Sequence, residues 1–263
     1  MAGNWKMYKT PAETIAFFEK FRPLVGTSEH CEIVICPPFT NLAAAVDAAK
    51  GTRIRVGAQN VAWAKEGAFT GEVSGAMIVA AGATHAIVGH SERRQYFGET
   101  DETVLKRTQA ALEYGLTPIV CVGERLEERE SGRTEAVLIG QFQKGIAGLS
   151  GQQFAKIVIA YEPVWAIGTG KTATPEIAAD AHRVIRAQVR AKYGKEAGDA
   201  VRILYGGSVK PDNVKSLMAQ PEIDGSLVGG ASLDAVSFAA IVNFLGREVG
   251  RPGTAPEIGS RTN

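Results

Sequence analysis

The sequence predicts a single-domain α/β protein that folds as a (β/α)8 barrel, and two observations lead to this prediction. Short apolar, β-branched runs alternate with helical patterns eight times, with no linker and no change of composition. Such alternation indicates parallel strands joined by right-handed crossovers. Eight units in 263 residues suit a closed barrel of roughly 250 residues better than an open sheet. We therefore assign residues 1–249 to the barrel, and expect residues 250–263, rich in Gly, Pro, Ser and Thr, to form a disordered tail.

The predicted strands are short runs of mainly apolar residues bounded by Gly, Pro or polar residues. A parallel strand inside a barrel is covered on both faces, so a continuous apolar run is expected rather than alternation. The first extended segment is very short and contains Asn4, Trp5 and Lys6. The other strands are expected at 32–36, 54–59, 85–88, 117–122, 157–161, 202–205 and 225–228.

The predicted helices follow the strands in turn. In the first of them, Ile15, Phe18 and Phe21 recur at helical spacing between charged residues, which is typical of an amphipathic helix. Thr174 and Pro175 supply an N-cap and a first-turn proline for a long helix. The helices are expected at 12–24, 39–50, 74–81, 91–114 in two pieces, 133–148, 175–193, 211–219 and 232–245.

Composition narrows the function classes. The net charge is +1, so no strong overall field favours nucleic acid or an anionic membrane. No apolar run approaches the roughly 18 residues of a membrane helix, and the N-terminus has no apolar segment typical of a secretory signal. Cys31, Cys36 and Cys121 match no zinc spacing and are expected to be buried, reduced thiols. These features predict a cytoplasmic protein with no nucleic-acid or membrane partner.

Polar residues at the carboxyl ends of the strands indicate the function, because barrel active sites lie at that end. Glu162 ends an apolar strand immediately before Pro163, and a carboxylate there costs several kcal/mol unless partnered. His90 opens a predicted helix, whose dipole favours a neutral imidazole; a satisfied buried histidine is the alternative. Lys6 beside Asn4 is interpreted as a cation aimed into the pocket, with an ordinary surface lysine as the alternative.

Glycine-rich turns follow the seventh and eighth strands, where barrels often bind phosphate. They are Gly206-Gly207-Ser208 and Gly229-Gly230, whose backbone N–H groups could converge on an anion; simple tight turning is the alternative. After Glu162, an apolar segment containing Trp165 runs into Gly168. This pattern indicates either a lid that excludes water or a core tryptophan in an ordinary turn.

These groups together predict a proton-transfer site for a small phosphorylated carbonyl compound. Other signals are weaker. Residues 168–172 resemble the end of a phosphate-binding P-loop but lack its first glycine, and the four histidines are scattered singly, which argues against a metal site. Cys121 at a strand end has no histidine near it in sequence and is better explained by core packing.

Several motifs in this order resemble the triosephosphate isomerase family, whose fold is the TIM barrel. The likeness covers nearly the whole chain, from Ala2 to about residue 245. The matching segments are GNWKM (3–7), GAFTGEVS (67–74), VGHSERR (88–94), YEPVWAIGTGK (161–171), YGGSVKP (205–211) and LVGGASL (227–233).

The resemblance implies interconversion of dihydroxyacetone phosphate and glyceraldehyde 3-phosphate through an enediolate, without a cofactor or metal. The family is itself a standard worked example of a carboxylate base paired with a neutral imidazole, so this pairing is a known property of the family. Glu162 matches the base that moves the proton between two carbons, and His90 the neutral electrophile. Lys6 matches the cation that stabilises charge on oxygen, Asn4 the polar group beside it, and Glu92 a buried carboxylate near that lysine.

The resemblance also implies a phosphate cradle made by the backbone N–H groups of Gly168, Ser208, Gly229 and Gly230, with Gly168 joining when the lid closes. In this family the long third loop inserts into a neighbouring subunit. Loop 60–74, with Thr70 near its tip, therefore implies a homodimer.

Two departures from the family pattern stand out. Tyr8 replaces the asparagine that usually follows Met7, outside the chemistry. Only Met1 and Ala2 precede Gly3, so we expect a truncated or misassigned start and a loosely held first strand that lacks ladder hydrogen bonds, each worth about 0.5–1.5 kcal/mol. The rival functions are a metal-dependent epimerase, a Schiff-base aldolase and a non-catalytic phosphate-binding barrel. Glu162 stands where the aldolase would need a lysine, and simple binding would not require Lys6, His90 and Glu162.

Overall fold

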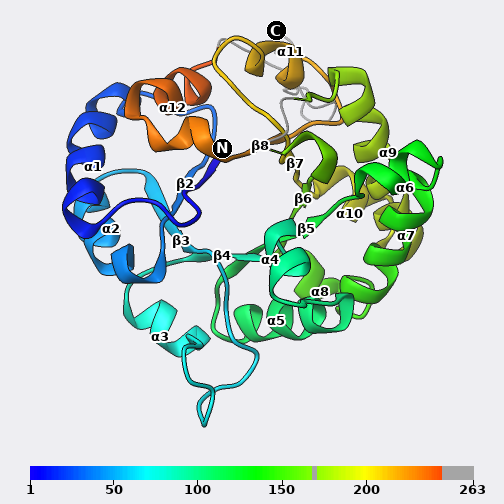
Figure 1. The fold of residues 1–263 in the computed structure, drawn as a ribbon, viewed down its shortest axis with the longest axis horizontal. Helices are drawn as coiled ribbons and strands as arrows, with labels where there is room; N and C mark the ends of the chain where they lie inside the picture. The colour runs from blue at the N-terminus through cyan, green and yellow to red at the C-terminus, as the bar shows by residue number, and fades with distance from the viewer. Residues whose placement is uncertain (168–170, 245–263) are drawn as a thin grey trace, which may run out of the picture.

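Eight parallel strands close into one barrel in the order of the sequence, as predicted (Figure 1). The structure is a computed structural model and describes residues 1–167 and 171–244. The predicted tail at 250–263 lies outside the described residues. The strands are β1 (Ala2–Asn4), β2 (Ile33–Cys36), β3 (Ile54–Ala58), β4 (His85–Val88), β5 (Thr117–Val122), β6 (Val158–Tyr161), β7 (Ile203–Tyr205) and β8 (Gly225–Val228).

Helices form a ring outside the barrel (Figure 1). Several begin at caps that the sequence encodes, such as the reciprocal Thr10–Glu13 capping box at the first helix. The α-helices are α1 (Pro11–Val25), α2 (Leu42–Ala49), α3 (Gly75–Ala80), α4 (Ser91–Tyr96), α5 (Asp101–Glu113), α6 (Leu126–Glu130), α7 (Thr134–Gly145), α8 (Gly151–Phe154), α9 (Pro175–Tyr193), α10 (Lys195–Ala200), α11 (Val214–Met218) and α12 (Ala235–Val242). The 3-10 turns are η1 (Phe39–Asn41), η2 (Val164–Ala166) and η3 (Gly230–Leu233).

The core has two layers, which explains why the strands read as unbroken apolar runs. Along β6, Val158 and Ala160 belong to a cluster inside the barrel, whereas Ile159 and Tyr161 pack outward beneath the helices. Successive strand side chains point to opposite faces, and both faces are covered. The inner cluster consists of Ala2, Val34, Cys36, Ile87, Ile119, Cys121, Val158, Ala160, Leu204 and Leu227.

The first strand has three residues and is paired on both sides. Ala2, Gly3 and Asn4 pair with Val34, Ile35 and Cys36 of β2, and two residues of β1 pair with β8. The ladder continues to the first residue, because the N–H of Val34 donates to the Met1 carbonyl at 2.9 Å. The barrel is therefore closed at β1.

Some local predictions were wrong. In α1, Phe18 and Phe21 are fully buried, as predicted, but Ile15 is 46% exposed and Phe17 takes part in the buried face at 4%. Cys31 is half-buried, although Cys36 and Cys121 are buried as expected. The short helices α8 and α10, of four and six residues, were not predicted.

Candidate active site

The predicted strand-end residues meet at one cavity of about 690 Å³ at the carboxyl ends of the strands. Gly168 lies outside the described residues, and Thr70 is on an exposed part of loop 60–74, away from this cavity. Glu92 joins the site through Lys6 rather than by lining the cavity, and its side chain is 38% exposed, not buried as the resemblance implied. The predicted residues that line it are Asn4, Lys6, His90, Glu162, Ser208, Gly229 and Gly230.

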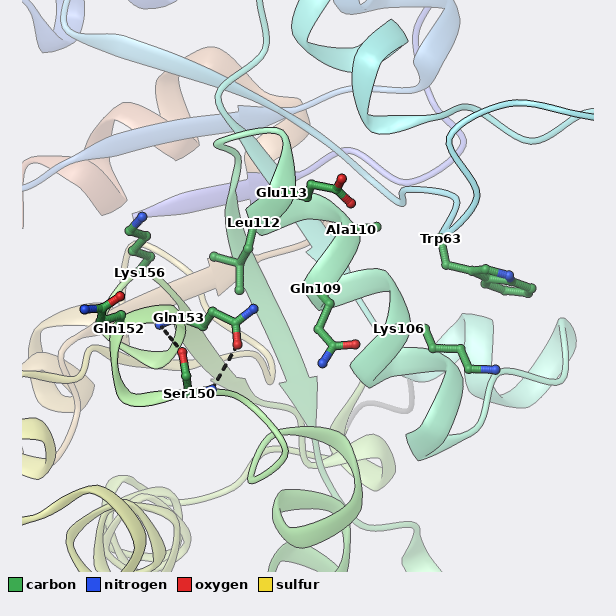
Figure 2. A pocket seen from close by; sticks show the side chains of 10 residues that line it. All are labelled: Trp63, Lys106, Gln109, Ala110, Leu112, Glu113, Ser150, Gln152, Gln153 and Lys156. Carbon is green, nitrogen blue, oxygen red and sulfur yellow. Dashed lines mark hydrogen bonds between the residues drawn. The ribbon is translucent and has the colours of Figure 1, made fainter.

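A second cavity, of about 720 Å³, lies elsewhere on the molecule (Figure 2). It is formed by α5, by the Ser150–Lys156 segment and by Trp63, and none of the predicted site residues lines it. The volume of a cavity therefore does not identify the active site. The convergence of polar residues from the strand ends identifies it.

Glu162 follows β6 directly and is 2% exposed. Its carboxylate accepts hydrogen bonds from the N–H and the hydroxyl of Ser91, at 3.0 and 3.4 Å, and one oxygen lies 2.8 Å from Nε2 of His90. Burial by itself would raise the pKa of Glu162, but His90 and the N–H of Ser91 outweigh it, so the pKa lies below its usual value. The group is an ionised carboxylate at neutral pH.

His90 is the N-cap of α4, and its Nδ1 atom accepts a hydrogen bond from the N–H of Glu92 at 3.3 Å. An Nδ1 that accepts carries no proton, so the ring proton is on Nε2, which donates to Glu162. Burial lowers the pKa of His90, but the adjacent Glu162 carboxylate raises it above its usual value overall. The N-terminus of α4 thus favours the predicted neutral imidazole. The Glu162 carboxylate favours the imidazolium for as long as the two side chains remain in contact.

Lys6 has a left-handed backbone conformation, with φ of 51°. Its neighbours hold it there: Asn4 Oδ1 accepts from the Lys6 N–H at 3.0 Å, and Gln59 donates to the Lys6 carbonyl at 2.8 Å. The ammonium group pairs with Glu92 at 2.5 Å. Such strain in a non-glycine residue is typical of functional sites, and here it accompanies an ammonium group on the pocket wall.

The turn after β7 needs a glycine because it lies against the base. A Cβ atom at Gly206 would lie 2.9 Å from Cγ of Glu162 and 3.2 Å from the Tyr161 carbonyl oxygen. The N–H of Gly206 donates to that same carbonyl at 2.7 Å. Close approach to Glu162 therefore explains Gly206, and both predicted glycine turns line the cavity, through Gly206, Gly207, Ser208, Gly229 and Gly230.

The segment after Glu162 is tied to a residue that the sequence analysis missed. Trp165 is 9% exposed, and its indole N–H donates to the buried carboxylate of Glu124 at 2.8 Å. Glu124 also accepts from the Tyr161 hydroxyl at 3.1 Å, and its carbonyl accepts from the Val164 N–H at 3.1 Å. Trp165 is thus neither exposed nor a purely apolar core residue. Glu124 follows β5 by two residues, so the strand-end criterion could have found it; Ser91, beside His90, was missed as well.

Of the weaker sequence signals, Cys121 lies beside the proposed base, because its thiol interacts with the Glu162 carboxylate. Cys121 is buried, and burial raises the pKa of its thiol well above the usual value. In the part of the chain that the structure describes, no group of three or more His, Cys, Asp or Glu side chains is placed to hold a metal ion. None of the helices within residues 1–167 and 171–244 is long and apolar enough to cross a membrane.

The closed barrel and the carboxylate, imidazole and ammonium groups at its carboxyl end define the class of (β/α)8-barrel enzymes. A family model described as triosephosphate isomerase matches residues 1–245. The chain therefore belongs to the triosephosphate isomerase family, whose members interconvert dihydroxyacetone phosphate and glyceraldehyde 3-phosphate.

Individual relatives agree with the family model. The triosephosphate isomerase of Solibacter usitatus is 85% identical over 244 residues, which cover 93% of this chain and 98% of that protein. The one from Citrifermentans bemidjiense is 57% identical, with 93% and 97% covered. The crystal structure of triosephosphate isomerase from Bartonella henselae superposes with a TM-score of 0.83 at 39% identity, covering 92% of this chain and 96% of that one.

Proposed function

We propose that this protein interconverts dihydroxyacetone phosphate and D-glyceraldehyde 3-phosphate in glycolysis and gluconeogenesis, with Glu162 as the base. The observation that carries this assignment is the convergence of the Glu162 carboxylate and the His90 Nε2 atom, 2.8 Å apart, in a cavity that Lys6 also lines. A proton-transfer reaction needs both an ionised base and a proton donor within reach of one substrate.

Glu162 takes a proton from the carbon beside the substrate carbonyl and returns it to the neighbouring carbon. Its lowered pKa keeps it ionised at neutral pH. Its contacts with Ser91 and His90 are hydrogen bonds that a substrate can replace. Gly206 leaves room beside the carboxylate, because no Cβ crowds Cγ of Glu162.

His90 donates its Nε2 proton to the substrate carbonyl oxygen as the enediolate forms, and recovers a proton from the neighbouring hydroxyl. The single imidazole ring of His90 thereby exchanges protons with both substrate oxygens. The ammonium of Lys6 stabilises the negative charge that develops on oxygen, and Asn4 holds the backbone from which Lys6 projects. Glu92 pairs with the ammonium and orients it.

The phosphate group is held by backbone N–H groups at Ser208, Gly229 and Gly230, which line the same cavity. With a net charge of +1, the protein attracts the dianion little at long range, so local donors and Lys6 provide the affinity. Gly168, the remaining predicted member of the cradle, lies outside the described residues.

We further propose a homodimer in the cytoplasm, formed through loop 60–74. This loop extends beyond the ring of helices, beside α3 (Figure 1). Phe69 within it is 48% exposed and Thr70 is exposed, and other large apolar side chains are also open, including Met7 at 94% and Phe97 at 66%. A second subunit packed on the loop would cover such apolar side chains. The free cysteines agree with a reducing compartment.

The decisive experiment measures isomerase turnover of the purified protein on glyceraldehyde 3-phosphate, beside Glu162→Asp. We expect the variant to lose about 10²-fold or more in kcat, because a shift of about 1 Å in a catalytic group has that effect. Binding of inorganic phosphate, measured as competitive inhibition or by calorimetry, should persist in both. A folded wild type that binds phosphate but does not turn over would instead indicate a phosphate-binding barrel without catalysis.

A further inference from the structure

Gly123, the first residue after β5, lies directly against the main chain of Glu162. A Cβ atom at Gly123 would lie 1.7 Å from the Glu162 carbonyl oxygen and 2.6 Å from its carbonyl carbon. The preceding residue is also linked to Glu162, because the Glu162 N–H donates to the Val122 carbonyl at 2.8 Å. The segment after β5 therefore determines where the main chain of the proposed base lies.

One side chain holds both polar groups of Gly123. The Gly123 N–H donates to Oε1 of Gln141 at 2.7 Å, and Nε2 of Gln141 donates to the Gly123 carbonyl at 3.0 Å. A primary amide that both accepts and donates has its orientation fixed. Gln141 projects from α7, which is anchored in the core by Leu138 and Phe142, both buried.

The same segment supports the residues that follow the base. Glu124, next to Gly123, accepts the indole N–H of Trp165, and its carbonyl accepts the Val164 N–H. A change in the Gly123 peptide therefore displaces contacts of Glu162 and of the residues that follow it.

We propose that Gln141 is a positioning residue for the isomerase reaction: its amide fixes Gly123 and, through Gly123, the main chain of Glu162. The inference rests on the function proposed above for Glu162. Gln141 does not line the catalytic cavity, but it lines a separate cavity of about 350 Å³ together with Gly123 and Glu162. Its role is therefore to place the base and not to contact the substrate.

The test replaces the amide without changing the length of the side chain. In Gln141→Met both hydrogen bonds to Gly123 disappear, so Glu162 is expected to lose its alignment. We expect kcat to fall about tenfold or more, since small misplacements of a catalytic group are costly. The phosphate cradle is untouched, so KM and the inhibition constant of inorganic phosphate should stay within about twofold.

A second glutamine supplies the matched control. Gln153 accepts a hydrogen bond from the Ser150 N–H at 2.9 Å, on the wall of the second cavity and away from the catalytic one (Figure 2). Gln153→Met removes an amide by the same change and should leave kcat and KM as in the wild type. Gln141→Glu keeps the acceptor for the Gly123 N–H and loses the donor, so its kcat should lie between those of the wild type and Gln141→Met.

The outcomes separate the two proposals. An inactive wild type contradicts the proposed function itself. If the wild type is active and Gln141→Met turns over within twofold of it, or loses only thermal stability, Gln141 is merely structural and the inference is wrong. A rise in KM at unchanged kcat also contradicts it. If Gln141→Met does not fold, Gln141→Glu decides by the same criteria.

Discussion

The Nε2 atom of His90 lies 2.8 Å from a carboxylate oxygen of Glu162, so in this structure the proposed acid and base are hydrogen-bonded to each other. The N–H of Glu92 directs the ring proton to Nε2, and the N–H of Ser91 holds the carboxylate. A substrate carbonyl that enters the cavity competes for the same Nε2 proton. Binding therefore frees the carboxylate at the moment when a proton must be taken from carbon.

His90→Gln is expected to lower kcat by about 10²- to 10⁴-fold, the usual contribution of a positioned proton donor. The glutamine amide can donate a hydrogen bond but cannot transfer the proton. Because His90 is not part of the phosphate cradle, inhibition by inorganic phosphate should be unchanged. Steady-state kinetics in both directions measure the effect.

Ser91→Ala serves as the control for this prediction. The hydroxyl of Ser91 lies 3.4 Å from Glu162, whereas its N–H, which the variant keeps, lies at 3.0 Å. We expect a much smaller loss of kcat. Equal losses in the two variants would mean that His90 acts only by holding Glu162.

Lys6→Met is expected to raise KM by about tenfold or more, and to lower kcat as well. The ammonium group lies on the cavity wall, and the overall charge of +1 provides no other long-range attraction for a dianion. The measurement is KM at low and moderate ionic strength. A KM equal to that of the wild type would show that Lys6 faces Glu92 alone and does not contact the substrate.

Thr70→Arg is expected to weaken the proposed dimer, because a charged side chain at the tip of loop 60–74 would have to be buried without a partner. Sedimentation equilibrium at micromolar concentration measures the dimer fraction. Thr27→Arg, at another exposed threonine beyond α1, is the control and should leave the fraction unchanged. A wild type that is monomeric at every concentration would contradict the loop-based dimer.

The pH dependence of stability should include a contribution from His182, which is fully buried with Nδ1 facing the Glu222 carbonyl at 3.1 Å. Burial lowers the pKa of His182 to about 3, against about 6.5 in the unfolded chain. Between these two pH values the unfolded state binds one more proton than the folded state. The contribution of His182 to the free energy of unfolding is therefore fully present above about pH 6.5 and is lost as the pH falls toward about 3.

His182→Gln should therefore flatten the pH profile of unfolding. Its free energy of unfolding will be lower at pH 7, but the decrease from about pH 6 to about pH 4 should be less steep, by up to about 1.4 kcal/mol per pH unit. Urea titrations at several pH values measure this. His85 contributes in the same direction, since burial lowers the pKa of His85 to about 4. An unchanged slope in His182→Gln would show that His182 titrates alike in both states.

Arg186→Met should destabilise the fold by about 1–3 kcal/mol, because it leaves the buried carbonyls of Gly198 and Val201 and two partly exposed carboxylates without their partner. Arg186 is 5% exposed and pairs with Glu222 at 2.8 Å and Asp224 at 2.7 Å. Arg183→Met on the same helix is the control. Arg183 pairs with Asp180 in an exposed position, and such pairs contribute at most about 1 kcal/mol. Chemical denaturation of both variants tests the contrast.

The sequence determined the architecture of this protein to a large degree. The predicted bounds of β4, β5, β8 and α9 agree with the structure, because apolar periodicity, prolines and N-caps act over a few neighbouring residues. Eight such units then imply closure, and closure places Lys6, His90 and Glu162 at one end. The four residues of α8 form about one turn and left no periodic signal, and which side chains of α1 face the core depended on packing.

Only the tertiary structure decided which groups hold one another. Ser91 donates to a carboxylate 71 residues away, and Trp165 donates to Glu124, 41 residues away. The amide of Gln141 reaches Gly123 from a separate helix. No local pattern encodes these pairs, because their distances depend on how the strands close and the helices pack around them. The sequence thus determined which catalytic groups are present and at which strand ends they lie. The closed barrel determined the protonation state and the position of each group.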